Sequence, residues 1–241
     1  MKALILAAGR GKRLGKASEG LNKCMIDAFG KPLIEYSLDC ASSLNEITEI
    51  VIVVGYRAED IINKYGNSYR RKRIKYVIQW EQKGLVDAIE WAKPAINGDD
   101  FMLMLGDEFM VKPRHGEMIE KFKGENLFAV CGVIRVSDTK LIRKTYAIEY
   151  YGEKITGLVE KPAKPANDYM GTGNCIFKND ILNYIGKTPP NPNRHEKELP
   201  DMIQCAVNAG NDVHFFPICE RYVNLNSLDE LKILDSSFSH L

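Results

Sequence analysis

The sequence lacks the patterns of several common protein classes. Its six cysteines include no Cys-x-x-Cys pair, which argues against a disulfide framework and against a closely spaced zinc site. No apolar run approaches the roughly 18 residues of a membrane span, and the first residues show no signal-peptide pattern. The net charge is only +1, so no overall field attracts nucleic acid or an acidic membrane. These absences predict free thiols in a soluble, cytoplasmic protein that binds neither nucleic acid nor membrane.

Several catalytic and nucleotide-binding motifs are missing as well. There is no Gly-x-Ser-x-Gly nucleophile elbow, and the four histidines have no triad or metal-ligand spacing. The sequence does not match a Walker A loop, because Ala17 follows Gly15-Lys16 where the motif needs Ser or Thr. The spacing of Gly9, Gly11 and Gly15 is one residue too long for a dinucleotide fingerprint, which disfavours a dehydrogenase. Asp-x-Asp is absent, which argues against a nucleotide-sugar glycosyltransferase.

The stretch after the first predicted strand combines glycine with positive charge. Residues 2–8 are apolar and predict a buried strand, and residues 9–16 then contain three glycines and four cations. Glycine lets backbone N–H groups approach a ligand closely, and the cations suit a polyphosphate. A solvated surface loop is the alternative interpretation.

Periodicity along the chain predicts an α/β fold. In the first half, apolar strands alternate with amphipathic helices, which is typical of a parallel, doubly wound sheet. The predicted strands there are residues 2–8, 48–55, 74–79 and 101–105. The second half mixes strands, a hairpin turn at 151–154 and a helix at 200–209. We therefore expect a Rossmann-like three-layer α/β/α domain with a mixed, mostly parallel sheet and a small α+β insertion.

Three polar segments follow predicted parallel strands and should therefore meet at one edge of the sheet. They are the glycine-rich loop, the segment 79–84 and Asp107. In open α/β sheets, ligands bind beyond the carboxyl ends of the strands. The sequence thus predicts a ligand site at this edge.

Three motifs near the N-terminus resemble the signature of the sugar-phosphate nucleotidylyltransferases. They are LAAGRGKRLG, the segment Asn22-Lys23-Cys24-Met25-Ile26, and Gly30-Lys31-Pro32-Leu33-Ile34. The resemblance implies that Arg13 and Lys23 are catalytic cations that neutralise a triphosphate, and that the first loop binds the nucleotide. The loop residues concerned are Ala7, Ala8, Gly9, Gly11 and Lys12. Asn22 departs from the family, which usually has proline there.

The resemblance also implies a magnesium site. Asp107, in Leu-Gly-Asp, matches the family's metal-binding aspartate, although a turn aspartate is the alternative. Asn224 lies where the family commonly has a second aspartate; its amide oxygen can bind Mg²⁺ but carries no charge. Asn226 and Asp229 are nearby alternatives for the second ligand.

Further along the chain, motifs resemble the base and acceptor sites of the same family. Gln79 and Gly84 match the base-binding segment of glucose-1-phosphate thymidylyl- and uridylyltransferases, which favours dTTP or UTP. Glu160 and Lys161 match the Glu-Lys-Pro motif, whose lysine binds the phosphate of the sugar. Thr172 and Asn174 match the start of the strand that borders the family's sugar pocket. The resemblance therefore implies four acceptor-binding residues: Glu160, Lys161, Thr172 and Asn174.

From these motifs we expect one domain spanning residues 1–241, with a nucleotide-binding part at about 1–110 and an acceptor-binding part at about 111–225. The expected reaction is Mg²⁺-dependent: an NTP and a sugar 1-phosphate give an NDP-sugar and pyrophosphate. Two alternatives stay open, a CTP-dependent cytidylyltransferase for a small phosphate such as phosphocholine, and a non-catalytic nucleotide-sugar sensor. The expected partners are the two substrates, and a homo-oligomer is compatible with the resemblance.

Overall fold

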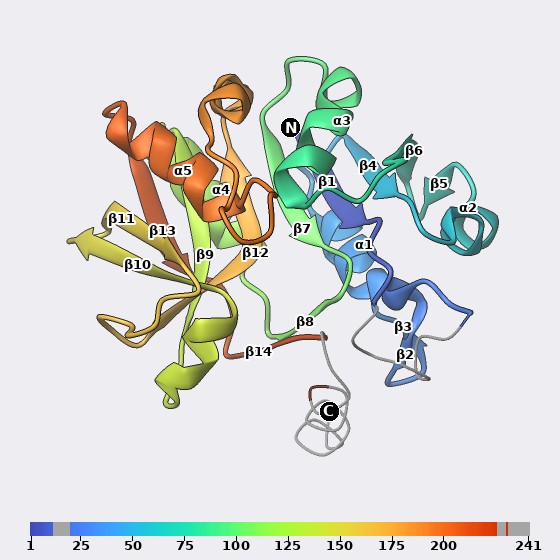
Figure 1. Cartoon of the computed structure of the whole chain (residues 1–241). Helices are drawn as coiled ribbons and strands as arrows, with labels where there is room; N and C mark the ends of the chain where they lie inside the picture. The colour runs from blue at the N-terminus through green and yellow to red at the C-terminus, as the bar shows by residue number, and fades with distance from the viewer. Residues whose placement is uncertain (12–19, 226–229, 231–241) are drawn as a thin grey trace.

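A ten-stranded sheet runs through the whole protein (Figure 1). The computed structural model describes residues 1–11, 20–225 and 230. In spatial order the strands are β10 (Tyr146–Tyr151), β11 (Lys154–Glu160), β13 (Val213–Pro217), β9 (Ala129–Arg135), β12 (Tyr169–Phe177), β7 (Phe101–Leu105), β1 (Lys2–Ala7), β4 (Glu49–Val54), β6 (Lys72–Ile78) and β5 (Ser68–Tyr69).

The first half of the chain forms the parallel part of the sheet. Strands β7, β1, β4 and β6 are parallel neighbours, and β1 pairs with both β7 and β4. Side chains of β1 alternate between two buried clusters: Leu4 and Leu6 lie in one, Ala3 and Ile5 in the other. This burial on both faces explains why the strand is a continuous apolar run.

Helices cover both faces of the sheet, which confirms the predicted three-layer α/β/α fold. The layer on the Leu4 face contains α3 (Leu85–Ile96), the 3₁₀ helix η4 (Asn179–Lys187) and α5 (Leu199–Asn208). The layer on the Ile5 face contains α1 (Ile34–Ser43), α2 (Ala58–Tyr65) and α4 (His115–Gly124). Figure 1 shows α3 and α5 on the same side of the sheet.

The second half of the chain continues the same sheet. Strand β12 runs antiparallel to β7 and joins the two halves. The hairpin of β10 and β11 was predicted, and β10 also pairs with β12 through Ala147 and Met170. This extra pairing closes β10, β11, β13, β9 and β12 into a ring. Without this pairing, β10 would be an open edge of the sheet.

Two short antiparallel pairs fix the loops at the carboxyl edge of the sheet. Strand β8 (Glu108–Val111) pairs with β14 (Arg221–Asn224), and the Leu225 N–H donates to the carbonyl of Asp107 at 3.0 Å. Strands β2 (Asp27–Ala28) and β3 (Lys31–Pro32) form the second pair, just after the 3₁₀ helix η2 (Lys23–Met25). The last described segment of the chain therefore returns to the end of β7.

The basic run at 70–73 is used partly within the fold. Arg70 pairs with Asp39 at 2.6 Å, and the Lys72 ammonium donates to the carbonyls of Leu44 and Ile47.

The remaining 3₁₀ helix, η3 (Thr139–Lys144), precedes β10. All six cysteines are free. Within the described ranges, no helix has the length and apolar character needed to cross a membrane.

Candidate active site

A cavity of about 730 Å³ lies at the carboxyl ends of β1, β6 and β7, and residues of both halves of the chain line it. It brings together most of the residues that the sequence predicted. Those in its wall are Ala8, Gly9, Gly11, Lys23, Gln79, Gly84, Asp107, Glu160, Lys161, Thr172 and Asn224. Lys12 and Arg13 lie outside the described residues, so the predicted role of the loop cations rests on the sequence alone.

Lys23 and Asp107 form an ion pair in the wall of the cavity. Their side chains are 10% and 15% exposed, so both charges are largely removed from bulk water. Gly11, at φ +64°, lies against the aliphatic part of Lys23: a Cβ added to Gly11 would come within 3.0 Å of the Lys23 Cβ. The glycine therefore allows the loop after β1 to pack on the lysine.

Asn22 holds the start of the η2 helix, directly before Lys23. It is fully buried; its amide nitrogen donates to the carbonyls of Ala7 at 3.0 Å and Tyr56 at 2.7 Å, and its side-chain oxygen accepts from the Cys24 N–H at 2.9 Å. The backbone of Asn22 has φ −67°, which proline also adopts. The departure from the family pattern is thus compatible with the same backbone path, and the asparagine adds three side-chain hydrogen bonds.

We expect Asn22→Ala to destabilise the fold by about 2–3 kcal/mol, because it leaves two carbonyls and one N–H without their partner in a buried site. Urea unfolding followed by circular dichroism measures the change. Asn67→Ala is the matched control, since Asn67 is exposed. Equal stability of the two variants would contradict the assigned role of the buried amide.

Asp107 and Asn224 supply oxygen atoms on adjoining segments. Asn224 pairs with Glu108 in the β8–β14 ladder, and the next residue bonds to the Asp107 backbone. One carboxylate and one amide, with phosphate oxygens and water completing the shell, fit the ligand preferences of Mg²⁺. Asn226 and Asp229, the alternative ligands, lie outside the described residues.

Glu108 is a buried carboxyl group that the sequence analysis missed. It lines the cavity and is 4% exposed, and it accepts hydrogen bonds from the Gly173 N–H at 2.9 Å and from Tyr222. Burial raises the pKa of Glu108 to about 8, and the neighbouring Asp107 carboxylate contributes to the rise. The only feature of the sequence that could have indicated Glu108 is that it is a second acidic residue after a fully apolar strand.

Two predicted residues lie behind the cavity wall. The carbonyl of Ala7 is bonded to Asn22, and its side chain is buried against the Ile5 face of the sheet. Asn174 donates to Glu108, and its oxygen accepts from the His115 ring at 2.7 Å. Thr172 and Asn174 would share a face in a regular strand, but the pairing of β12 with β9 is irregular between Gly171 and Cys175. This irregularity leaves Thr172 in the wall of the cavity and Asn174 in a second cavity on the other side of Glu108.

Gly84 stands at the N-terminus of α3 with φ +96°, a conformation that favours glycine. A Cβ at this position would lie 3.1 Å from the Glu196 carboxylate, which reaches over from the opposite half. Gln79, at the end of β6, is 3% exposed and also lines the cavity. The predicted base-binding segment therefore lies at a helix N-terminus, where free N–H groups favour polar ligands.

The wall of the cavity contributed by the second half of the chain carries several cations. Glu160 pairs with Lys161 at 2.8 Å and with Arg194 at 3.0 Å, and Arg194 also contacts Glu198. Burial raises the pKa of Glu198, and Glu160 adds to the effect. Arg194 was not predicted, because it lies in a loop far from the Glu-Lys-Pro motif and its position depends on the packing of that loop. Arg143 and Lys144 line the same wall.

Lys161 has a backbone conformation that is costly for a residue with a side chain. Its φ is +45°, and its N–H donates to the Thr145 carbonyl at 2.6 Å. Left-handed conformations of non-glycine residues cluster at functional sites, where the surrounding structure holds them in place. This strain is a second reason, besides the motif, to assign Lys161 to the site.

We expect Lys161→Gly and Lys161→Ala to reduce turnover equally, because both remove the ammonium group. The glycine variant should be more stable than the alanine variant by about 1 kcal/mol, because glycine adopts a positive φ without strain. Thermal unfolding and steady-state kinetics on the two proteins measure the two effects. Unequal turnover would mean that the backbone, and not the ammonium group, carries the function.

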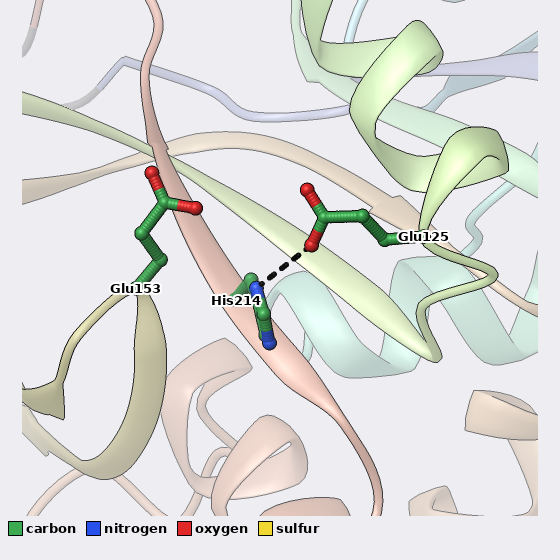
Figure 2. A group of neighbouring side chains, drawn as sticks. All are labelled: Glu125, Glu153 and His214. Carbon is green, nitrogen blue, oxygen red and sulfur yellow. Dashed lines mark ion pairs between the residues drawn. The ribbon is translucent and has the colours of Figure 1, made fainter.

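Three side chains of the kinds that bind metal ions lie close together outside the cavity wall: Glu125, Glu153 and His214 (Figure 2). The His214 Nδ1 is 3.4 Å from a Glu125 oxygen. The Lys121 ammonium contacts both carboxylates, at 2.7 and 2.6 Å, and so provides the positive charge that a metal ion would bring. Burial, followed by the charge of Lys121, lowers the pKa of His214. We interpret this group as an ion-pair network.

Comparison with known proteins identifies the family of the chain. The model of the nucleotidyl transferase family matches residues 2–219. The chain is 33% identical over 214 residues to the UTP–glucose-1-phosphate uridylyltransferase AglF of Haloferax volcanii, covering 88% of this chain and 86% of that protein. It is 28% identical over 216 residues to a glucose-1-phosphate thymidylyltransferase of Streptomyces griseus, covering 88% of this chain and 59% of that protein.

Solved structures share the fold. A UDP-glucose pyrophosphorylase in complex with UDP-glucose superposes with a TM-score of 0.86 at 20% identity, covering 99% of this chain and 98% of that one. The family match extends over both halves of the chain and includes most of the cavity wall. The protein therefore belongs to the nucleotidyl transferase family, as its motifs indicated, and is a nucleotidyltransferase.

Proposed function

We propose that the protein transfers a nucleotidyl group from UTP or dTTP to a sugar 1-phosphate in a Mg²⁺-dependent reaction. The observation that carries the proposal is the distribution of charge across one cavity. Lys23 and Asp107 lie on the wall contributed by the first half of the chain, and Lys161 and Arg194 lie on the wall contributed by the second. We accordingly assign the nucleotide to residues 1–110 and the acceptor to residues 111–225.

In the proposed reaction, a phosphate oxygen of the sugar 1-phosphate attacks the α-phosphorus of the nucleotide. The bond from this phosphorus to the bridging oxygen breaks, and pyrophosphate leaves. Asp107 and Asn224 would hold the Mg²⁺, which supplies positive charge to the triphosphate when bound. Lys23 neutralises negative charge that develops on the nucleotide phosphates, and Lys161 and Arg194 orient the acceptor phosphate for attack.

The cavity also supports direct attack by the substrate without a covalent enzyme intermediate. Cys24 is the one cysteine in the described cavity wall. Burial raises the pKa of its thiol well above the usual range, and Asp107 adds to the rise. A buried protonated thiol is a poor nucleophile. The acceptor phosphate itself is therefore the proposed nucleophile.

The preference for UTP or dTTP rests on two supports. The relatives named above act, by their names, with UTP or as thymidylyltransferases on glucose 1-phosphate. In addition, Gln79 and Gly84 line the cavity at the segment that resembles the family's base-binding motif. An amide side chain and a backbone N–H together match the imide edge of uracil or thymine.

The test is pyrophosphate release with Mg²⁺, using UTP, dTTP, CTP, ATP and GTP against glucose 1-phosphate and phosphocholine. We expect release with UTP or dTTP and the sugar phosphate. Release only with CTP and phosphocholine would assign the protein to the cytidylyltransferases instead. Nucleotide binding without turnover, measured by calorimetry on the same samples, would support the sensor alternative.

A further inference from the structure

The amide of Gln79 is held in one orientation by groups that can only accept hydrogen bonds. Its nitrogen Nε2 donates to the Asp87 carboxylate at 2.6 Å and to the Gly84 carbonyl at 3.3 Å. A carboxylate and a carbonyl offer no proton, so rotating the amide by 180° would bring its oxygen against two acceptors. The two acceptors therefore fix which end of the amide is available to a ligand.

The end that remains is the carbonyl oxygen Oε1, which is an acceptor. Gln79 is 3% exposed and lines the cavity, so this oxygen belongs to a side chain with little freedom to move. Its backbone is fixed as well: the Gln79 N–H donates to the Val54 carbonyl at 2.8 Å, and its carbonyl accepts from the Gln82 side chain at 3.2 Å. The structure thus presents a preset acceptor at the end of β6.

We propose that Asp87 is a positioning residue that sets base selectivity, by holding Gln79 so that its Oε1 accepts the N3–H of uracil or thymine. The inference rests on the proposed function, because it takes the cavity to be a nucleotide site. Asp87 itself is not part of the cavity wall. It lies in the first turn of α3 and contacts the Gln79 amide, so it acts on the base only through Gln79.

The orientation distinguishes uracil from cytosine bound in the same place. Uracil and thymine present a proton at N3, which Oε1 accepts. Cytosine presents a lone pair at N3, and two acceptors facing each other leave a buried polar group without a partner. A site that hydrogen-bonds its ligand discriminates strongly against a ligand with a mismatched donor or acceptor. An apolar pocket discriminates far less against a ligand that differs slightly in shape. CTP is therefore the nucleotide that this arrangement excludes.

The experiment compares Asp87→Asn with wild-type protein and measures the ratio of kcat/KM for UTP to that for CTP. Asparagine keeps the size of the side chain but offers both a donor and an acceptor, so the Gln79 amide can turn to suit either base. We expect the ratio to fall about tenfold, the effect of about one hydrogen bond between partners of which one is charged. If Asp87 only stabilised the helix, the substitution would change kcat/KM for both nucleotides equally and leave the ratio unchanged.

Two further proteins make the result decisive. Glu117→Gln is the matched control, since Glu117 is the acidic residue in the first turn of α4 and is exposed. Gln79→Leu removes the acceptor with Asp87 intact, and it should lose the same selectivity; it also serves if Asp87→Asn does not fold. 3-Methyluridine triphosphate, which lacks the N3 proton, should bind wild-type protein no better than CTP does.

The outcomes separate this inference from the proposed function. Turnover with UTP in wild-type protein and an unchanged ratio in Asp87→Asn would overturn the inference and leave the function standing. If wild-type protein turns over no nucleotide, calorimetric affinities for UTP and CTP in the same variants decide the inference alone. Tighter binding of CTP than of UTP by wild-type protein would overturn it.

Discussion

Asp107→Asn is expected to lower kcat by about a thousandfold or more, a loss of roughly 4 kcal/mol of transition-state stabilisation. The carboxylate is the charged member of the proposed metal site, and Asn224 contributes only a neutral amide. Asp107 also forms the ion pair with Lys23. Asparagine therefore removes two interactions of the carboxylate, the one with the proposed metal ion and the one with Lys23. Pyrophosphate release at increasing Mg²⁺ concentration measures the loss, which should be only partly recovered at high Mg²⁺.

The matched control is Asp212→Asn. Asp212 is an exposed carboxylate that pairs with Lys154 far from the cavity wall, so its loss should leave kcat unchanged. If Asp107→Asn kept more than about a tenth of wild-type kcat, Asp107 would be a turn residue, as the alternative reading of its motif allows.

The second large effect is expected for Lys23→Met, which should reduce kcat/KM by about a hundredfold or more. Methionine keeps the unbranched stem that packs against Gly11 and removes only the ammonium charge. The loss should fall mainly on kcat, because the charge neutralised by Lys23 increases in the transition state. Steady-state kinetics with the preferred nucleotide, together with its calorimetric affinity, separates the two contributions.

Lys23→Arg tests whether position matters as well as charge. Arginine keeps the positive charge, but its wider, planar head group has to fit in the cavity wall where the Lys23 ammonium contacts Asp107. We expect this variant to remain well below wild type. Wild-type kcat in Lys23→Met would remove Lys23 from the mechanism, and the role of neutralising the triphosphate would pass to the cations of the first loop. Wild-type kcat in Lys23→Arg would show that a positive charge at this position is sufficient.

The effects of the two substitutions should not add. Lys23 and Asp107 contact each other, and residues that share a partner or act in one step show strong coupling in double-mutant cycles. We therefore expect the double variant Asp107→Asn, Lys23→Met to be little worse than the poorer single variant. Fully additive losses would indicate that the ion pair has no part in the arrangement of the site.

The sequence was sufficient to place residues of the first half of the chain at one cavity, because their positions follow from local rules. Gly9, Gln79 and Asp107 each lie within two residues of the end of a parallel strand, and the carboxyl ends of such strands meet at one edge of the sheet. Apolar strands buried on both faces also predict the three-layer architecture. Neither conclusion needs knowledge of how distant segments pack.

The cavity wall contributed by the second half of the chain was predicted less completely, because it depends on contacts between segments far apart in the chain. Arg194 reaches Glu160 across 34 residues, and the Tyr222 hydroxyl reaches Glu108 across 114. Asn174 was assigned to the acceptor pocket, but an irregularity in β12 turns it toward His115. No spacing rule predicts such an irregularity, since it arises from the pairing of β12 with its neighbours.

The sequence by itself determined the fold class, the family and the edge of the sheet where most of the predicted site residues meet, because strand periodicity and short motifs are local properties of the chain. Only the tertiary structure decided how each polar group is held. It gave Asn22 three side-chain hydrogen bonds in place of a proline ring, and it set the Gln79 amide by placing Asp87 beside it. Hydrogen bonds depend on distance and direction between groups, and these are fixed only when the elements pack together.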